Sequence, residues 1–216
     1  MGPLAVIHHT GRLVVIDKPA GLLSVPGKGP QNQDCAAARV AAAFPGASGP
    51  LVVHRLDMET SGLLLFGLDP AAQRSLSMQF EARTIGKRYH ALLADDPREA
   101  GNPAEGEISI PIRADITRRP LQVVDDVQGR HATTRYRILG PRTGGCLIEF
   151  EPVTGRSHQL RLHSASPRGL GTPIVGDRLY GGIPAPRLML HASWLEFTDV
   201  DSGERTAVRS PAPFLG

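Results

Sequence analysis

The sequence predicts an α+β fold with a mixed, largely antiparallel β-sheet core and flanking helices. Short alternating apolar segments outnumber helical patterns along the 216 residues. Most links between these segments are too short for the crossover helices that parallel strands require. The chain shows no internal repeat and no convincing linker, so we expect a single domain over residues 1–216.

Strands are predicted where β-branched and apolar residues alternate with polar ones. The first, Val14–Asp17, is β-branched and ends at the Pro and Gly of Lys18–Gly21. The other predicted strands are Leu51–Val53, Ser61–Leu68, Arg88–Ala94, Glu107–Ile112, Leu121–Asp125, His131–Leu139, Cys146–Val153, Leu188–Phe197 and Arg205–Arg209.

Three helices are predicted from their capping residues. Asp and Ser side chains accept hydrogen bonds from the unpaired N–H groups of a first turn, and proline is favoured at the first helical position. The predicted spans are Cys35–Phe44 after Asp34, Pro70–Ala82 after Asp69, and His158–Ala165 after Ser157.

Composition narrows the class of protein. Cys35 and Cys146 belong to no Cys-x-x-Cys pair, so we expect two buried thiols in a reducing compartment. The apolar segments are too short to span a bilayer, and Met1–Thr10 lacks a secretion-signal pattern. A cytoplasmic protein with no membrane partner is therefore expected.

The basic residues point to nucleic acid. Of the 24 basic residues all but Lys18, Lys28 and Lys87 are arginine, and the formal net charge is +3. The planar guanidinium suits phosphate and stacked bases better than an ammonium does. Arginine in place of lysine can equally reflect genome composition, so this signal alone decides nothing.

Asp57 is the strongest candidate for a reactive group. It stands in the segment His54–Gly62, directly before the apolar run that is predicted as a strand. A strand of this kind buries its side chains only if the preceding polar segment lies at the rim of the sheet, where a ligand has access. Asp and Thr before a strand are also ordinary turn residues, so the segment by itself leaves both interpretations open.

A second polar segment, Thr154–His163, opens the third predicted helix and carries two Arg and two His. Helix N-termini attract anions, although a capped helix with a solvated basic face has the same pattern. His158 and His163 are five residues apart and so point in different directions on a helix, unlike the i, i+4 pair of a zinc helix. No metal site is predicted.

Other enzyme classes fit less well. Asp57 and Glu59 could imitate the two acids of a glycosidase, but no second acid has an evident apolar pocket. Ser61 precedes a strand instead of following one, unlike the serine of a Gly-x-Ser-x-Gly elbow. A carboxylate nucleophile or base, one or two Arg and the phenol of Tyr89 remain, a set that needs no cofactor.

Six motifs in this order resemble the RluA-type RNA pseudouridine synthases, over nearly the whole chain. They are Asp17–Gly27, His54–Asp57 with Thr60–Gly62, Lys87–Ala91, Thr154–His163, Pro173–Gly181 and Leu188–Ala192. The resemblance implies the catalytic-domain fold of that family, with an active-site cleft along the sheet, and an isomerase that turns specific uridines of structured RNA into pseudouridine.

The resemblance also implies roles for single residues. Asp57 would be the essential aspartate, Tyr89 the tyrosine against the target base, and Arg161 the cation that pairs with Asp57. Arg55 would enter the space that the flipped nucleotide leaves, because extrusion of a base costs a few kcal/mol. Arg156 is a further expected RNA contact.

Lys18, His54 and His191 are expected to be either structural or RNA-facing, and Lys18 is placed with the RNA-binding residues. For both histidines, burial with satisfied hydrogen bonds is the favoured role. All three residues stand in motifs on which the resemblance to the family rests.

The implied partner is RNA, an rRNA or tRNA stem-loop, with no metal, no nucleotide cofactor and a monomeric protein. The first strand is expected so early in the chain that no S4-like RNA-binding domain precedes it. Two alternatives stay open: an RNA-binding protein that retains the fold without catalysis, and a nucleoside or glycoside hydrolase that uses Asp57.

Overall fold

The computed structural model describes residues 4–215, which fold into two compact units. One unit comprises Met1–Lys87 with His191–Gly216, and the other comprises Arg88–Leu190. No helix in the described part of the chain has the length and apolar character to cross a membrane. The expectation of a single domain stays a prediction.

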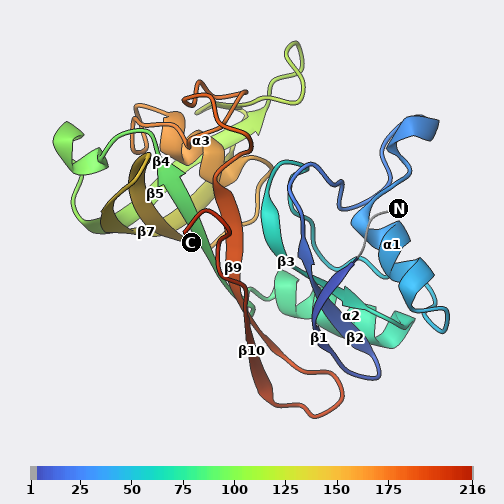
Figure 1. The fold of residues 1–216 in the computed structure, drawn as a ribbon. Helices are drawn as coiled ribbons and strands as arrows, with labels where there is room; N and C mark the ends of the chain where they lie inside the picture. The colour runs from blue at the N-terminus through green and yellow to red at the C-terminus, as the bar shows by residue number, and fades with distance from the viewer. Residues whose placement is uncertain (1–3, 216) are drawn as a thin grey trace. The chain divides into compact units, whose positions relative to one another are not determined.

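The first unit is built around a β-sheet (Figure 1). β1 (Ala5–His9), β2 (Leu13–Lys18), β3 (Ser61–Gly67) and β9 (Leu190–Thr198, which enters the unit at His191) are neighbours in this order, and β10 (Arg205–Arg209) lies off this path and pairs with β9. Neighbours pair in antiparallel fashion except β3 and β9, which are parallel through Ser61 and Gly62.

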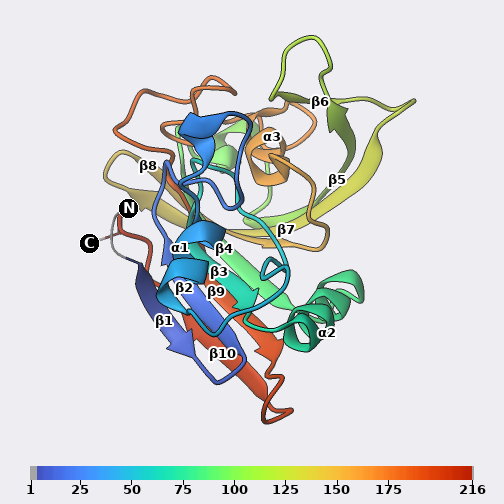
Figure 2. The same cartoon turned by 90° about the vertical axis from the view of Figure 1, so that its right-hand side faces the viewer.

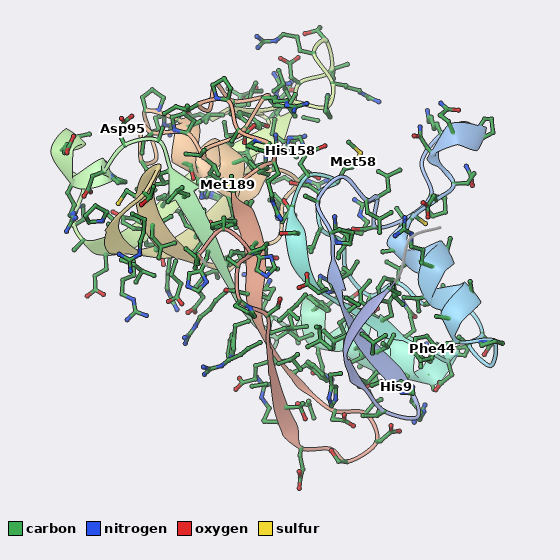
Figure 3. The ribbon with its side chains drawn as sticks, in the orientation of Figure 1. His9, Phe44, Met58, Asp95, His158 and Met189 are labelled. Carbon is green, nitrogen blue, oxygen red and sulfur yellow. The ribbon has the colours of Figure 1, made fainter. Side chains whose placement is uncertain are left out.

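Strands β2 and β3 form the centre of this unit, because nearly all of their side chains are buried on both faces. Two helices, α1 (Ala36–Ala43) and α2 (Pro70–Glu81), flank the strands (Figure 2). Leu76 of α2 packs into one cluster with Leu13 and Val15 of β2 and Leu65 of β3. At the end of α1 the ring of Phe44 lies 4.8 Å from that of His9 in β1 (Figure 3).

The two helix starts differ in how well they were predicted. Asp69 caps α2 as expected, with its carboxylate accepting from the N–H groups of Ala71 and Ala72. For α1 the predicted cap is wrong: the cap is Cys35, while Asp34 pairs with Arg39. A guanidinium is a stronger partner for a carboxylate than a backbone N–H, and the cap falls to the next residue.

The second unit is an antiparallel sheet. In spatial order its strands are β4 (Gly86–Leu93, which enters the unit at Arg88), β8 (Gly145–Pro152), β7 (Arg130–Arg142), β5 (Glu105–Ala114) and β6 (Gln122–Val124). All four pairings are antiparallel. Short 3-10 turns occur at Pro97–Ala100 here and at Pro30–Asn32 in the first unit.

Helix α3 (Gln159–Ala165) covers this sheet, with Leu160 and Leu162 in its buried cluster. Its start was predicted wrongly by one residue. The cap is His158 instead of Ser157, and it takes a left-handed conformation with φ of 51° and no side-chain cap. The left-handed backbone of His158 turns the chain sharply and sets where the helix begins. Preferences for capping side chains do not predict this start, because no side chain caps the helix.

The predicted fold class is confirmed, since the strands are mixed and mostly antiparallel with three α-helices. Strands β2, β5 and β7 extend one to three residues beyond both predicted ends, β3 and β6 are slightly shorter than predicted, β4, β8 and β9 are shifted by one or two residues, and β10 has the predicted bounds. The predicted strand Leu51–Val53 is reduced to one isolated bridge between Val52 and Phe66. β1 was not among the predicted segments, because its side chains are mostly exposed and lack a buried face.

Candidate active site

Asp57 lies on the loop that leads into β3, in the first unit. Its carbonyl oxygen accepts a hydrogen bond from the N–H of Thr60 at 3.1 Å, which closes a tight turn. The strand that follows is buried along its whole length. Asp57 is half-buried and the neighbouring side chain of Met58 is exposed (Figure 3). The turn that carries the carboxylate is therefore attached to a rigid strand.

Gly62 fixes how this strand meets β9. Its φ is +111°, and a Cβ at this position would lie 2.3 Å from the carbonyl oxygen of Ala192. No other residue fits such a close approach in this backbone region. The glycine five residues after Asp57 thus permits the parallel pairing of β3 with β9.

Lys18 is fully buried, and its ammonium donates to three backbone carbonyls, those of Pro19, Leu22 and Met58, at 2.7–3.0 Å. Three acceptors match the three N–H bonds of an ammonium, which offsets the cost of burying its charge. The structure shows structural contacts for Lys18, whose ammonium does not reach the surface. The assignment of Lys18 to direct RNA binding stays a prediction that these contacts do not favour.

His54 also has a structural role. Its Nε2 accepts from the N–H of Leu65 at 3.0 Å, and its ring stacks on Phe80 with centroids 4.4 Å apart. Burial of the ring and, secondarily, the charge of Lys87 lower the pKa of His54 to about 3. The imidazole is therefore neutral at physiological pH and joins the loop before β3 to the strand itself.

His191 is buried at the start of β9 and completes a chain of polar contacts. Its Nδ1 lies 2.7 Å from Oγ of Ser61, and its Nε2 lies 3.2 Å from both oxygens of Ser210. The hydroxyl of Ser210 in turn donates to Asp17 at 2.6 Å. Both histidines thus make hydrogen bonds within the protein, which supports the structural role favoured for them.

Arg161 is the central polar residue of the second unit. Its Nε and Nη2 donate to the two carboxylate oxygens of Asp177 at 2.7 and 2.6 Å, and both side chains are almost completely buried. This is the bidentate arrangement that fixes a guanidinium most firmly. Asp177 also accepts from the N–H groups of Leu179 and Tyr180, so its own position is fixed.

Tyr180 covers this ion pair, with its ring 5.3 Å from the guanidinium carbon of Arg161. Its hydroxyl accepts from the N–H of Gln122 in β6 at 2.8 Å and lies 3.0 Å from Nδ1 of His158. The ring thus joins α3, the segment of Asp177 and strand β6. The motif that contains Asp177 and Tyr180 carried part of the family resemblance, but sequence reasoning gave neither residue a role. A carboxylate near a predicted catalytic Arg in the fold leaves no signal in sequence spacing.

The remaining predicted residues of this unit lie in ordinary surroundings. Tyr89 is half-buried in β4, opposite Phe150 of β8, and packs against the apolar cluster of the unit. Arg156 is exposed before α3, and its backbone N–H donates to the side chain of Gln159. Arg55, in the first unit, is exposed as well.

The predicted catalytic residues are divided between the two units. Asp57 belongs to the first unit, whereas Tyr89 and Arg161 belong to the second. Within the second unit the structure gives Arg161 a carboxylate partner, Asp177, that was not foreseen. The pairing of Arg161 with Asp57 stays a prediction.

His163 in α3 is buried, and neither of its ring nitrogens has a hydrogen-bond partner among the described residues. Burial lowers its pKa to about 4. Within residues 4–215 no three His, Cys, Asp or Glu side chains are gathered as a set of metal ligands. The side chain is therefore neutral and packs as an aromatic ring at physiological pH.

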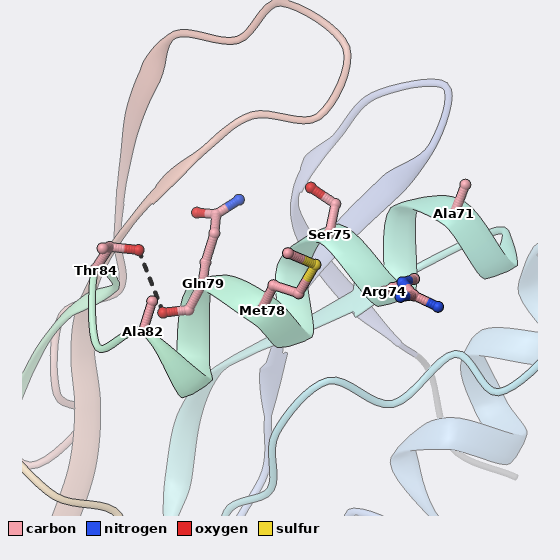
Figure 4. A pocket seen from close by; sticks show the side chains of 7 residues that line it. All are labelled: Ala71, Arg74, Ser75, Met78, Gln79, Ala82 and Thr84. Atoms are coloured by element: carbon pink, nitrogen blue, oxygen red, sulfur yellow. Dashed lines mark hydrogen bonds between the residues drawn. The ribbon is translucent and has the colours of Figure 1, made fainter.

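A shallow hollow lies along the outer side of α2 and the turn that follows it (Figure 4). Arg74, Met78 and Thr84 are among the residues that line it. None of the residues with a predicted role in catalysis or RNA binding lines this hollow, so we assign it no function.

Comparisons with known sequences single out one family. Residues 12–166 match the sequence model described as RNA pseudouridylate synthase. The chain is 38% identical to the dual-specificity RNA pseudouridine synthase RluA of Escherichia coli K12, and 40% identical to the protein of the same name from Pasteurella multocida. Both alignments cover 98% of this chain and 94% of the relative.

Solved structures show the same likeness. The human RNA pseudouridylate synthase domain containing 1 superposes with a TM-score of 0.76 at 28% identity, over 99% of this chain and 87% of that one. The human domain containing 4 gives the same TM-score at 26% identity, over 98% of this chain and 89% of that one.

Proposed function

Because the chain belongs to the RNA pseudouridylate synthase family, we propose that it isomerises specific uridines in an rRNA or tRNA stem-loop to pseudouridine, with Asp57 as the essential residue. The observation that carries this proposal is the match of the family over residues 12–166, which includes the turn of Asp57 and the helix of Arg161. Each of these residues stands in one of the six motifs of the sequence.

The reaction breaks the N-glycosidic bond of uridine, turns the uracil within the site and joins its C5 to C1′ of the same ribose. Asp57 acts as an ionised carboxylate, either by attack on C1′ or by removal of the 2′ proton. Both routes regenerate the carboxylate at the end of the cycle, and neither uses a metal or nucleotide cofactor. Atoms are conserved between substrate and product, since the reaction is an isomerisation.

In this proposal Arg161 is the cation that pairs with Asp57 and fixes its rotamer. Its own side chain is supported by the buried bidentate contact with Asp177. Tyr89 lies against the uracil as a flat apolar surface, and its hydroxyl accepts or relays the proton released from C5.

Arg55 assists extrusion of the uridine. A base stacked in RNA does not present its sugar and C5 to a carboxylate, so the nucleotide leaves the stack at a cost of a few kcal/mol. The exposed guanidinium of Arg55, two residues before Asp57, offsets part of this cost by stacking in the vacated space and contacting phosphate. Arg156 contributes a further phosphate contact from the second unit.

The choice of substrate rests on the relatives. The bacterial relatives carry "dual-specificity" in their names, which supports more than one RNA target for this chain. We propose that the protein acts on these RNAs as a monomer in the cytoplasm.

Tritium release tests the activity and the role of Asp57 together. RNA labelled with tritium at C5 of uridine loses the label when pseudouridine forms, and we expect release with the wild-type protein and none with Asp57→Asn. Release at the wild-type rate from Asp57→Asn would refute the role given to Asp57. Free uracil among the products would indicate a nucleoside hydrolase, and binding without release would indicate a non-catalytic RNA-binding protein.

A further inference from the structure

The segment that follows β2, Lys18–Ser24, contacts the chain on both sides of Asp57. This segment is part of the first motif of the sequence, to which the proposed chemistry gives no task. Ser24 bonds Leu56, the residue before Asp57, while Lys18 and Gly21 bond Met58, the residue after it. All of these residues belong to the first unit.

Ser24 binds both polar backbone groups of one residue. Its hydroxyl donates to the carbonyl oxygen of Leu56 at 2.7 Å and accepts from the N–H of Leu56 at 3.0 Å. The side chain of Ser24 is only 4% exposed and that of Leu56 is buried too. Water is therefore a poor substitute for the hydroxyl, and its loss leaves two buried backbone groups without this partner.

On the other side of Asp57 the carbonyl oxygen of Met58 accepts two hydrogen bonds. One comes from the buried ammonium of Lys18 at 3.0 Å and the other from the N–H of Gly21 at 2.9 Å. The side chain of Met58 is exposed, so the backbone is the part of this residue that the protein holds.

These contacts determine the backbone conformation of Asp57. Each peptide group is planar, so the φ and ψ of Asp57 are set by the orientations of the two planes on either side of it. The plane before it contains the carbonyl of Leu56, which Ser24 binds; the plane after it contains the carbonyl of Asp57, which the N–H of Thr60 binds. Lys18 and Gly21 act one plane further on: they bind the carbonyl of Met58 inside the turn from Asp57 to Thr60 and so hold the turn that makes this second contact. With both planes held, the Cα–Cβ bond of Asp57 has one direction.

We propose that Ser24 is a positioning residue that, together with Lys18, fixes the direction of the Asp57 side chain for pseudouridine formation. This inference rests on the proposed function of Asp57. Precise placement matters for such a step, because a displacement of about 1 Å at a reacting group lowers a rate by about a hundredfold. Ser24 acts through the backbone of Leu56 and touches no RNA.

Ser24→Ala tests the proposal, with single-turnover tritium release and RNA affinity measured separately. We expect the rate to fall by about ten- to a hundredfold, while the dissociation constant for the RNA changes less than about twofold, since no RNA contact is removed. Ser24→Thr, which keeps the hydroxyl, recovers most of the rate.

Asp69→Ala is the matched control. Asp69 also binds two backbone groups of the first unit, the N–H groups of Ala71 and Ala72, but at the start of α2 instead of beside Asp57. We expect it to lower the midpoint of urea denaturation and leave the single-turnover rate at the wild-type value. An equal loss of rate in Asp69→Ala and Ser24→Ala would overturn the proposal, since general loosening of the unit would then explain both.

A wild-type rate in folded Ser24→Ala would also overturn it. If Ser24→Ala does not fold, the same two measurements are made on Lys18→Met. This variant removes the ammonium that binds the carbonyl of Met58 and keeps the approximate length of the side chain. A slow Lys18→Met protein that binds RNA normally supports the proposal, and a fast one contradicts it. Failure of the proposed function is distinguished by the wild-type protein: without tritium release from it, the role of Asp57 itself is wrong, and that of Ser24 with it.

Discussion

Buried charges decide how single residues behave in this protein. In the second unit Arg161 and Asp177 form a bidentate ion pair with almost no exposure, whereas Arg168 and Asp126 form a pair of similar length at the surface. Exposed pairs contribute little because water and salt screen them. Removal of one partner from a buried pair leaves a charge without compensation.

We therefore predict that Asp177→Ala lowers the free energy of unfolding by about 3–5 kcal/mol, whereas Asp126→Ala leaves it nearly unchanged. Urea denaturation followed by circular dichroism measures both. Because Asp177 holds Arg161 in place, we also expect Asp177→Ala to lose pseudouridine formation and Asp126→Ala to keep it. Equal stability of the two variants would show that the buried pair contributes no more than the surface pair.

His163 gives stability a pH dependence. Its pKa is lowered by burial from 6.5 to about 4 in the folded protein, so between these values the unfolded chain binds more protons than the native one. The contribution of His163 to the free energy of unfolding is then fully present above pH 6.5 and is lost as the pH drops toward 4. For this single group the loss at pH 5 is about 2 kcal/mol.

His163→Leu removes this titration and fills the site with an apolar side chain of similar burial. We predict that the difference in unfolding free energy between pH 7 and pH 5 becomes smaller by about 2 kcal/mol in this variant. His54, whose pKa is lowered to about 3, retains its own contribution in both proteins. An unchanged pH dependence in urea titrations of His163→Leu would contradict the explanation.

At the scale of elements, local chemistry explains α2 and fails for α1. The pair of Asp69 and Pro70 begins α2 without help from other elements, and the sequence was sufficient to predict it. At α1, Asp34 is drawn to Arg39 and the thiol of Cys35 accepts from Ala38 instead. A cap at Asp34 and a cap at Cys35 both begin the helix at nearly the same residue. The helix could therefore be predicted from the sequence, whereas its capping residue could not.

The pairing of β3 with β9 depends on Gly62. We predict that Gly62→Ala lowers the free energy of unfolding by several kcal/mol, because the new Cβ would lie 2.3 Å from the carbonyl oxygen of Ala192 in a backbone region that favours glycine. Gly46→Ala is the control, since a Cβ there meets no atom within 4 Å. Thermal unfolding of the two variants compares them directly. Equal stability would show that β3 and β9 adjust to the added carbon.

At the scale of the whole molecule, charge sets the strength of RNA binding more than its specificity. The chain carries 24 basic and 21 acidic residues, and many arginines are paired with acids on the strands of the second unit, as Arg137 is with Glu149. Arginines without a role in such pairs are the ones expected to contact phosphate. Phosphate contacts release counterions, so binding weakens as salt increases.

We predict that the logarithm of RNA affinity falls linearly with the logarithm of salt concentration, and that Arg156→Ala makes this slope shallower by about one unit. Arg137→Ala, at an exposed position paired with Glu149, leaves the slope unchanged. Fluorescence anisotropy with a labelled stem-loop at several salt concentrations gives both slopes. A slope of the Arg156→Ala protein equal to that of the wild type would remove Arg156 from the RNA contacts.

Much of the fold was determined by the sequence by itself. Alternation and β-branched residues predicted β2, β3 and the antiparallel strands of the second unit, since these patterns follow from which face of a strand is buried. The order of six motifs determined the family. The sequence also placed Asp57 in the polar segment before a buried strand, and the structure shows this strand as β3; the catalytic role of Asp57 stays a prediction.

Only the tertiary structure decided which partners the buried polar groups have. Lys18 was expected among the RNA contacts, yet its ammonium binds the carbonyl of Met58, forty residues away. Asp177 and Ser24 lie far along the chain from Arg161 and Leu56, to which they are bonded. A hydrogen bond depends on distance and direction in space, and sequence spacing carries this information only within a helix, a strand or a turn. Contacts between distant segments arise when the chain packs, so they appear only in the folded molecule.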